Sequence, residues 1–394
     1  MGAPGTPHPG LVGRPAYLDY NATTPVDPAV LEAMLPYLAT EFGNPSSAHA
    51  YGAAAHDAVG RARVQVAALV GAPAGSSLVF TGSGSEADAL AICGAVLASL
   101  RGRRWAHVIT QATEHPAVLA ACEDLRDLHD VRVTVLPVDA TGVVDPQAVE
   151  DAITPETVLV SVMHANNETG TIQPIPEIAR IAHERSVLVH TDAAQSVGKI
   201  TVNVAALGVD LLTVVGHKAY APKGVAALYV AAGVTLRPVV GGGGQEGGLR
   251  AGSENVPYAV GLGRAAELAG AALAAGETAR LAVLRDRLHV RLDDLLPGRV
   301  HLNGHPTDRL PNTLNISIDG ARALSVLDRL DAVAASAGSA CHSGQDKPSP
   351  VLTAMGLPHE RAVTALRLSL GRWSTSAEVD QAAEHIAAVV DITS

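Results

Sequence analysis

Three short apolar runs in the middle of the chain, each followed by polar residues, most strongly restrict its fold. They span residues 158–163, 187–189 and 211–215. Near-continuous apolar runs of this length are typical of strands that helices cover on both faces. In open α/β sheets, ligands bind in the loops at the carboxyl ends of such strands. The pattern therefore predicts an α/β protein whose functional site lies at those strand ends.

Lys218 follows the third run and is the first candidate functional residue. Burial at a strand end would desolvate its ammonium group, lower its pKa and make a neutral amine available, which is the form that attacks an aldehyde. The ordinary alternative is a lysine whose head group reaches solvent from a strand end. Asp192, which ends the second run's strand, favours the first interpretation, because a carboxylate can keep the ring nitrogen of a pyridine aldehyde cofactor protonated.

The stretch Val189–Gln195, followed by the tripeptide Gly216–Lys218, resembles the cysteine desulfurases and selenocysteine lyases, a branch of the class V aminotransferase-type fold. The resemblance covers about residues 17 to 394, with the motifs in family order. It implies that pyridoxal 5'-phosphate (PLP) is the cofactor. It also implies the PLP-dependent transferase fold (aminotransferase type I-like), an α/β fold with a mostly parallel seven-stranded sheet in a large domain and a smaller C-terminal α+β domain.

The expected domain boundaries follow from this resemblance and from composition. We expect a flexible N-terminal tail over residues 1–16, a large PLP-binding domain over 17–258 and a small domain over 259–394 that carries the active-site cysteine loop. The N-terminal segment of the large domain is expected to pack on the small domain. The Ala- and Leu-rich stretch 256–296 predicts one long helix that links the two domains.

Composition excludes several classes of partner. No apolar run approaches 18 residues, so we expect no membrane partner, and the formal net charge of −11 argues against a nucleic-acid surface. The three cysteines, at 93, 122 and 341, form neither a metal-binding spacing nor a disulfide ladder, so we expect no metal site and a cytoplasmic location. Residues 1–16 lack the apolar core of a signal peptide.

A glycine-rich turn at residues 82–84 stands between a short strand and a helix of small residues. Backbone N–H groups and the helix dipole at such a junction favour a phosphate group. The turn lacks the Gly-Lys-Ser/Thr of a Walker P-loop, and a merely flexible turn is the alternative. We predict that Gly84 and Ser85 bind the cofactor phosphate; family members usually carry threonine at the position of Ser85, and serine keeps the hydroxyl.

The resemblance assigns further cofactor contacts at the other strand ends. His115, at a strand-to-helix junction, is expected to stack on the cofactor ring and to transfer protons. Asn167 is expected to bind the phenolic oxygen of the cofactor or the substrate, and Gln195 the same oxygen. Asp192 is expected to pair with the ring nitrogen, and His217, beside the lysine, to contact the cofactor.

The glycine-rich segment 241–255 has the composition of a flexible linker. The resemblance implies instead that it reaches across a homodimer, where Ser253 donates to the phosphate in the partner's site. Two residues depart from the family pattern. Gly247 replaces a common arginine and Val215 replaces a hydroxyl residue, so the phosphate site is expected to have one donor fewer, although the selenocysteine lyase branch also carries Val-Gly-His-Lys.

Three residues are expected to act on the substrate. Asn21 lies in a segment that the resemblance places at the site entrance. Arg367, in an apolar strand, is expected to bind the carboxylate of an amino acid. Cys341, in a polar loop, is expected to be the nucleophilic thiol, whereas Cys93 and Cys122, in helical surroundings, are expected to be inert.

Together these residues predict a PLP-dependent cysteine desulfurase. Lys218 or His115 would move the α-proton of L-cysteine, and Cys341 would take the sulfur as a persulfide, leaving alanine. A sulfur-acceptor protein, such as an iron–sulfur scaffold, would receive that sulfur. The narrow alternative is a selenocysteine lyase acting on L-selenocysteine; the wider ones are an aminotransferase of the same fold and a catalytically silent scaffold.

Overall fold

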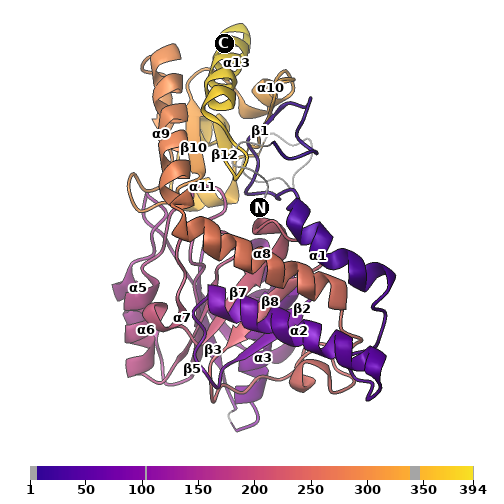
Figure 1. The fold of residues 1–394 in the computed structure, drawn as a ribbon. Coiled ribbons are helices and arrows are strands. Elements are labelled where there is room, and N and C mark those ends of the chain that lie inside the picture. Colours follow the sequence, from indigo (N-terminus) through magenta and orange to yellow (C-terminus); the bar gives the residue numbers. More distant parts are fainter. Residues whose placement is uncertain (1–6, 103, 338–346, 394) are drawn as a thin grey trace.

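The computed structural model describes residues 7–102, 104–337 and 347–393 of the chain. A seven-stranded sheet forms the centre of the larger part (Figure 1). Its strands, in spatial order, are β2 (Ser77–Thr81), β8 (Ala226–Val230), β7 (Leu211–Val215), β6 (Leu188–Asp192), β5 (Thr157–Ser161), β3 (His107–Gln111) and β4 (Arg132–Leu136). All neighbours are parallel except β8, which runs antiparallel to both β2 and β7. This arrangement confirms the predicted mostly parallel sheet.

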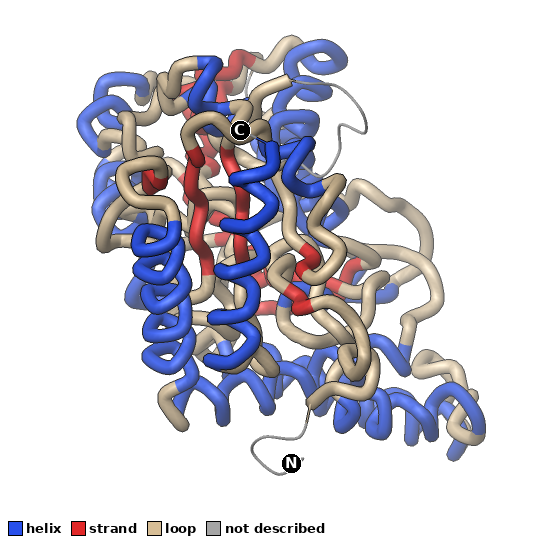
Figure 2. Tube along the Cα trace, turned by 90° about the horizontal axis from the view of Figure 1, so that it is seen from above, coloured by secondary structure: helices blue, strands red, loops and turns tan. Residues whose placement is uncertain are grey.

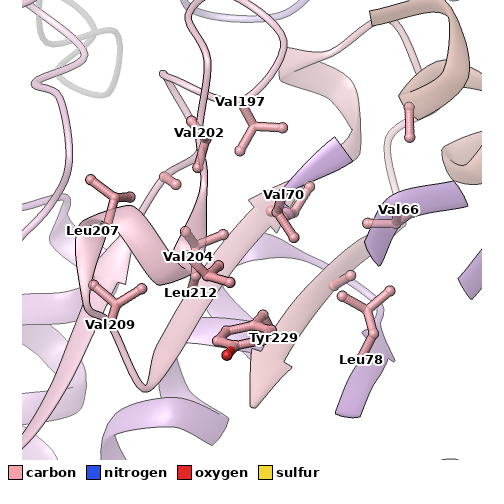
Figure 3. Packing of buried hydrophobic residues seen from close by; sticks show 14 of the residues in the cluster. Val66, Val70, Leu78, Val197, Val202, Val204, Leu207, Val209, Leu212 and Tyr229 are labelled. Carbon is pink, nitrogen blue, oxygen red and sulfur yellow. The ribbon is translucent and has the colours of Figure 1, made fainter. Parts of the chain in front are cut away.

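Helices cover both faces of the sheet, which explains why its strands are apolar on both sides. On one face, α3 (Gly84–Ser99) and α4 (Pro116–His129) pack on a cluster that includes Leu211. On the other, α2 (Ala50–Leu69), α6 (Ile175–Glu184), α8 (Val256–Ala274) and their neighbours pack on Leu212 and Val214. Figure 3 shows Leu212 and Tyr229 inside this second cluster. Successive strand residues thus enter opposite cores.

The second part of the chain is built on the antiparallel sheet β12 (Ala365–Ser369), β10 (Thr313–Ile318) and β9 (Val300–Leu302). Helices α9 (Glu277–Leu295) and α13 (Ser376–Thr393) lie side by side against it (Figures 1 and 2). Strand β1 (Ala16–Tyr17) pairs with β11 (Val333–Ala334), and Leu18 enters the same core. The N-terminal segment therefore packs on the C-terminal part.

The long helix predicted over residues 256–296 is wrong in one respect. The stretch forms two helices, α8 and α9, which Gly276 separates. Gly276 has a φ of 86°, in the left-handed region that glycine reaches without steric cost and that ends a helix. The break lets α8 cover the large sheet and α9 cover the small one. No helix in the described ranges is both long and apolar enough to cross a membrane.

Candidate active site

The candidate site lies at the carboxyl ends of β5, β6 and β7, where the sequence pattern predicted it. Lys218 closes a short 3₁₀ turn, Gly216–Lys218, directly after β7. Its Nζ donates to the carbonyl oxygens of Asn21, at 2.5 Å, and Ala22, at 2.8 Å. Burial and, to a lesser extent, the nearby Arg367 guanidinium lower the pKa of Lys218 to about 8, while Asp192 opposes both effects. A neutral amine is therefore accessible at mildly alkaline pH.

Asp192 is the last residue of β6 and is buried. Its Oδ1 accepts a hydrogen bond from the N–H of Ala194 at 2.8 Å. Burial raises the pKa of Asp192 above its ordinary value, and the hydrogen bond from Ala194 and the positions of His115 and Lys218 offset this only in part. A cationic partner stabilises the ionised form of a buried carboxylate, and a protonated ring nitrogen is such a partner.

His115 stands at the N-terminus of α4, at the mouth of the site. Its Nδ1 accepts the N–H of Ala117 at 3.2 Å, so the ring proton of the neutral imidazole is on Nε2. Desolvation lowers the pKa of His115, and Lys218 lowers it further while Asp192 raises it. His217 is held in its neutral form: burial and nearby cationic groups lower its pKa to about 4, and its Nδ1 lies 3.1 Å from the Thr23 hydroxyl.

The turn before α3 has the features of an anion site. Ser83 caps the helix by accepting the N–H of Glu86, and the N–H groups of Gly84 and Ser85 have no hydrogen bond within the described part of the chain. A Cβ on Gly84 would lie 2.6 Å from a methyl group of Val215. The close approach of strand β7 to this turn therefore requires glycine.

Glu86 links this turn to the glycine-rich segment 241–255. It accepts the N–H of Gly82 at 2.8 Å and pairs with Arg250 at 2.8 Å. Arg250 comes from the glycine-rich segment that precedes α8, so that segment lies against the turn of its own chain. Ser253, in the same segment, is exposed, and its predicted contact with a partner's phosphate stays a prediction.

Asn21 connects most of the predicted substrate and cofactor contacts. Its carbonyl oxygen accepts from Lys218 and from Nε2 of Gln195, at 3.1 Å. Its side-chain nitrogen donates to the carbonyl oxygen of Asn167, at 3.1 Å, and to the Thr313 hydroxyl, at 2.8 Å. Asn21 thus joins the N-terminal segment to both sheets, and its buried side chain is fully hydrogen-bonded within the protein.

Arg367 projects from β12 into the same region, with only 3% of its side chain exposed. Its Nη2 pairs with Asp19 at 2.8 Å and its Nη1 donates to the carbonyl oxygen of Asn167 at 3.2 Å. Its Nε is buried without a hydrogen-bond partner among the described residues. A buried guanidinium with an unused donor is suited to a carboxylate ligand.

Of the three cysteines, two are described. Burial raises the pKa of Cys93 to about 11 and that of Cys122 to about 12, which disfavours a thiolate at either position. Cys341, the predicted nucleophile, lies outside the described residues.

The sequence model of the family described as Aminotransferase class-V matches residues 16–382. The chain belongs to this family. Among curated relatives, the cysteine desulfurase of Gluconacetobacter diazotrophicus is 47% identical over 368 residues, which cover 93% of this chain and 90% of that protein. The cysteine desulfurase IscS of Methanosarcina thermophila is 45% identical over 381 residues, 96% of this chain and 92% of that one.

Solved structures of the family agree with this fold. A NifS-like protein superposes with a TM-score of 0.87 at 36% identity and covers 96% of this chain and all of its own. SspA, solved in complex with cysteine, superposes with a TM-score of 0.79 at 36% identity and covers 91% of this chain and all of its own.

Members of the class-V aminotransferase family are PLP-dependent, and the residues present here fit that cofactor. An amine with a lowered pKa, a buried carboxylate and a helix start with two unbonded N–H groups match its aldehyde, its ring nitrogen and its phosphate. All three lie at one edge of the sheet.

Sequence reasoning missed several buried charged residues of this family member. Burial and, to a lesser extent, the charge of Asp192 raise the pKa of Glu114 to about 8 and that of Asp88 well above its usual range. A pKa of about 8 favours the protonated form of Glu114 at neutral pH. Asp19 and Lys199 were also missed. Lys199 carried a signal, since the chain has only four lysines, at 199, 218, 223 and 347, and two of them lie here.

Proposed function

We propose that this protein is a PLP-dependent cysteine desulfurase that releases alanine from L-cysteine and forms a persulfide on Cys341. The observation that carries the proposal is the convergence of Lys218, Asp192 and Arg367. Asp192 and Arg367 lie close enough to Lys218 for their charges to shift its pKa. An amine, an acid for the ring nitrogen and a clamp for a carboxylate are what PLP chemistry on an amino acid requires. The relatives named cysteine desulfurase, at 47% and 45% identity, support the choice of substrate.

The residues that would hold the cofactor are those at the strand ends. Asp192 would pair with its ring nitrogen, His115 would lie on its ring, and the N–H groups of Gly84 and Ser85 would bind its phosphate. When bound, PLP supplies an electron sink for the negative charge that develops on the substrate's α-carbon. Asn167 and Gln195 would bind its phenolic oxygen, and His217 would contact it beside Lys218.

The protein's own groups would then handle the proton and the sulfur. Arg367 would bind the substrate's carboxylate through its free Nε–H, and the neutral amine of Lys218 would take the α-proton. The Cys341 thiolate would attack the substrate's sulfur. A sulfur–sulfur bond forms on Cys341 and the bond between the substrate's β-carbon and its sulfur breaks. The electron pair of that bond stays with the β-carbon, which is protonated to give alanine. His115 is the second candidate for these proton transfers.

A homodimer and a protein acceptor complete the proposal. Leu31, Leu35 and Leu38 lie on one exposed face of α1 (Pro28–Ala39), and Phe42 stacks on Tyr51 nearby. An exposed apolar face of this kind suits a protein interface, and a second copy would bring Ser253 to the partner's phosphate. The persulfide would pass to a sulfur-acceptor protein such as an iron–sulfur scaffold. A cytoplasmic location would keep the Cys341 thiol reduced.

The proposal is tested with purified protein supplied with PLP. L-cysteine should yield alanine in an amount matched by sulfide or by persulfide, and mass spectrometry should find one extra sulfur on the peptide that carries Cys341. Cys341→Ser should lose the extra sulfur and most alanine formation. Keto-acid formation that survives in Cys341→Ser would indicate an aminotransferase, and selenide release from L-selenocysteine without sulfide from L-cysteine would indicate a selenocysteine lyase.

The homodimer has its own test. Light scattering should give the mass of two chains for the wild type and one chain for Leu35→Lys. A wild type that stays monomeric at micromolar concentration would contradict the interface.

A further inference from the structure

Lys199 is a second buried lysine beside Lys218, and the reaction described above does not use it. It lies in the loop after β6 and is only 7% exposed. Among the residues that the structure describes, no carboxylate pairs with it. Its Nζ instead donates to two amide oxygens, Oε1 of Gln195 at 2.7 Å and Oδ1 of Asn21 at 3.3 Å. Burying an amine without an acid partner is costly, so the arrangement calls for a compensating role.

The contact with Lys199 decides which way the Gln195 amide faces. Oε1 of Gln195 is bound to the lysine, and Nε2 therefore faces the carbonyl oxygen of Asn21, at 3.1 Å. The reversed amide would place two donors together at Lys199 and two acceptors together at Asn21. The observed orientation therefore pairs a donor with an acceptor at both ends of the Gln195 amide.

The same carbonyl oxygen of Asn21 accepts Nζ of Lys218. Lys199 also holds the Asn21 side chain, together with Nδ2 of Asn312 at 3.0 Å. Two hydrogen-bond paths therefore run from Lys199 to the position of Lys218, one through the Gln195 amide and one through the Asn21 side chain. Loss of Lys199 would leave the Gln195 amide free to turn and would remove one of the four hydrogen bonds of the Asn21 side chain.

We propose that Lys199 is a positioning residue that keeps the Gln195 amide nitrogen directed toward the Asn21 carbonyl oxygen, which Lys218 also contacts, and helps to hold the Asn21 side chain. The inference rests on the proposed PLP chemistry. Desolvation and the charges of Lys218 and Arg367 lower the pKa of Lys199, so its amine is held there at an electrostatic cost. The group that depends on it is the Nε2 donor of Gln195, the residue that the proposed function assigns to the phenolic oxygen of the cofactor.

The test measures PLP binding to the cofactor-free protein by absorbance titration. Lys199→Met keeps the length of the side chain and removes its donors, and we expect it to weaken PLP binding about tenfold, the effect of losing one strong hydrogen bond. Lys199→Arg, which restores donors, should recover part of that loss. Lys223→Met changes an exposed lysine of the same region and should alter PLP affinity less than twofold.

A double-mutant cycle separates positioning from general destabilisation. If Lys199 acts through Gln195, Lys199→Met should weaken PLP binding far less in a Gln195→Leu background than in the wild type. The absorption maximum of bound PLP should also shift in the same direction in Lys199→Met and Gln195→Leu. A merely structural role would lower the melting temperature without moving that maximum.

The outcomes are distinct. A wild type that takes up no PLP would overturn the proposed function and this inference with it. A wild type that binds PLP with the same affinity as Lys199→Met, or a cycle in which the two losses simply add, would overturn the inference alone and leave the desulfurase proposal standing.

Discussion

Asp19 pairs with Arg367 at 2.8 Å, and the two residues are 348 positions apart in the chain. The carboxylate comes from the N-terminal segment and the guanidinium from β12. The negative charge of Asp19 therefore lies directly beside Arg367, the arginine that is proposed to bind the substrate's carboxylate. Because Asp19 occupies only Nη2, the Nε–H of Arg367 stays available.

Asp19→Asn should lower the free energy of unfolding by about 1–3 kcal/mol, because it leaves a buried guanidinium without its charged partner. Urea denaturation measures the change. Asp380→Asn is the matched control: it breaks the Arg287–Asp380 pair on the surface, where solvent screens the charges, and should have little effect. An equal loss of unfolding free energy in both variants would show that the buried Asp19–Arg367 pair stabilises the protein no more than a surface pair does.

Arg367→Lys should raise the KM for L-cysteine about tenfold to a hundredfold, since an ammonium cannot reproduce the fork of a guanidinium. Steady-state alanine formation measures it. Arg264→Lys, on the exposed face of α8, is the control and should leave the KM unchanged. An unchanged KM in Arg367→Lys would mean that another residue binds the carboxylate.

Lys218 should make the stability of the cofactor-free protein depend on pH. Its pKa falls from 10.5 to about 8 on folding, so between those values the unfolded state binds more protons and stability rises with pH. The 2.5-unit difference corresponds to about 3 kcal/mol, gained from pH 8 to pH 10.5. Measured by urea denaturation at each pH, the difference in stability between the wild type and Lys218→Met should grow by this amount over the interval, because Lys199 titrates in both proteins; parallel curves would contradict the lowered pKa.

Gly84→Ala should destabilise the protein by about 1–3 kcal/mol and weaken PLP binding, because the new methyl group would meet Val215 at 2.6 Å. Thermal unfolding and PLP titration measure the two effects. Gly60→Ala, inside α2 with open space around it, should instead stabilise by about 0.5–1 kcal/mol.

The close contact also predicts a rescue. Adding Val215→Ala to Gly84→Ala should recover stability, since it removes the methyl groups that the new side chain meets. Failure of that rescue would locate the strain elsewhere than in the Gly84–Val215 contact.

Much of the fold could be predicted from the sequence. The apolar runs at 158–163, 187–189 and 211–215 became β5, β6 and β7, because strands covered on both faces must be apolar on both sides. The error at Gly276 arose because an Ala- and Leu-rich composition does not show where one glycine takes a left-handed conformation and separates two helices.

The sequence by itself determined the order of the strands along the chain, the polar residues that end them and the family to which these belong. Only the tertiary structure decided which buried groups meet: Lys199 with Asn21, and Asp19 with Arg367. Their separations in the chain are 178 and 348 residues, so no local pattern records them. The physical reason is that hydrophobic burial brings the segments together, and the hydrogen bonds among them depend on positions that the packing of both cores sets.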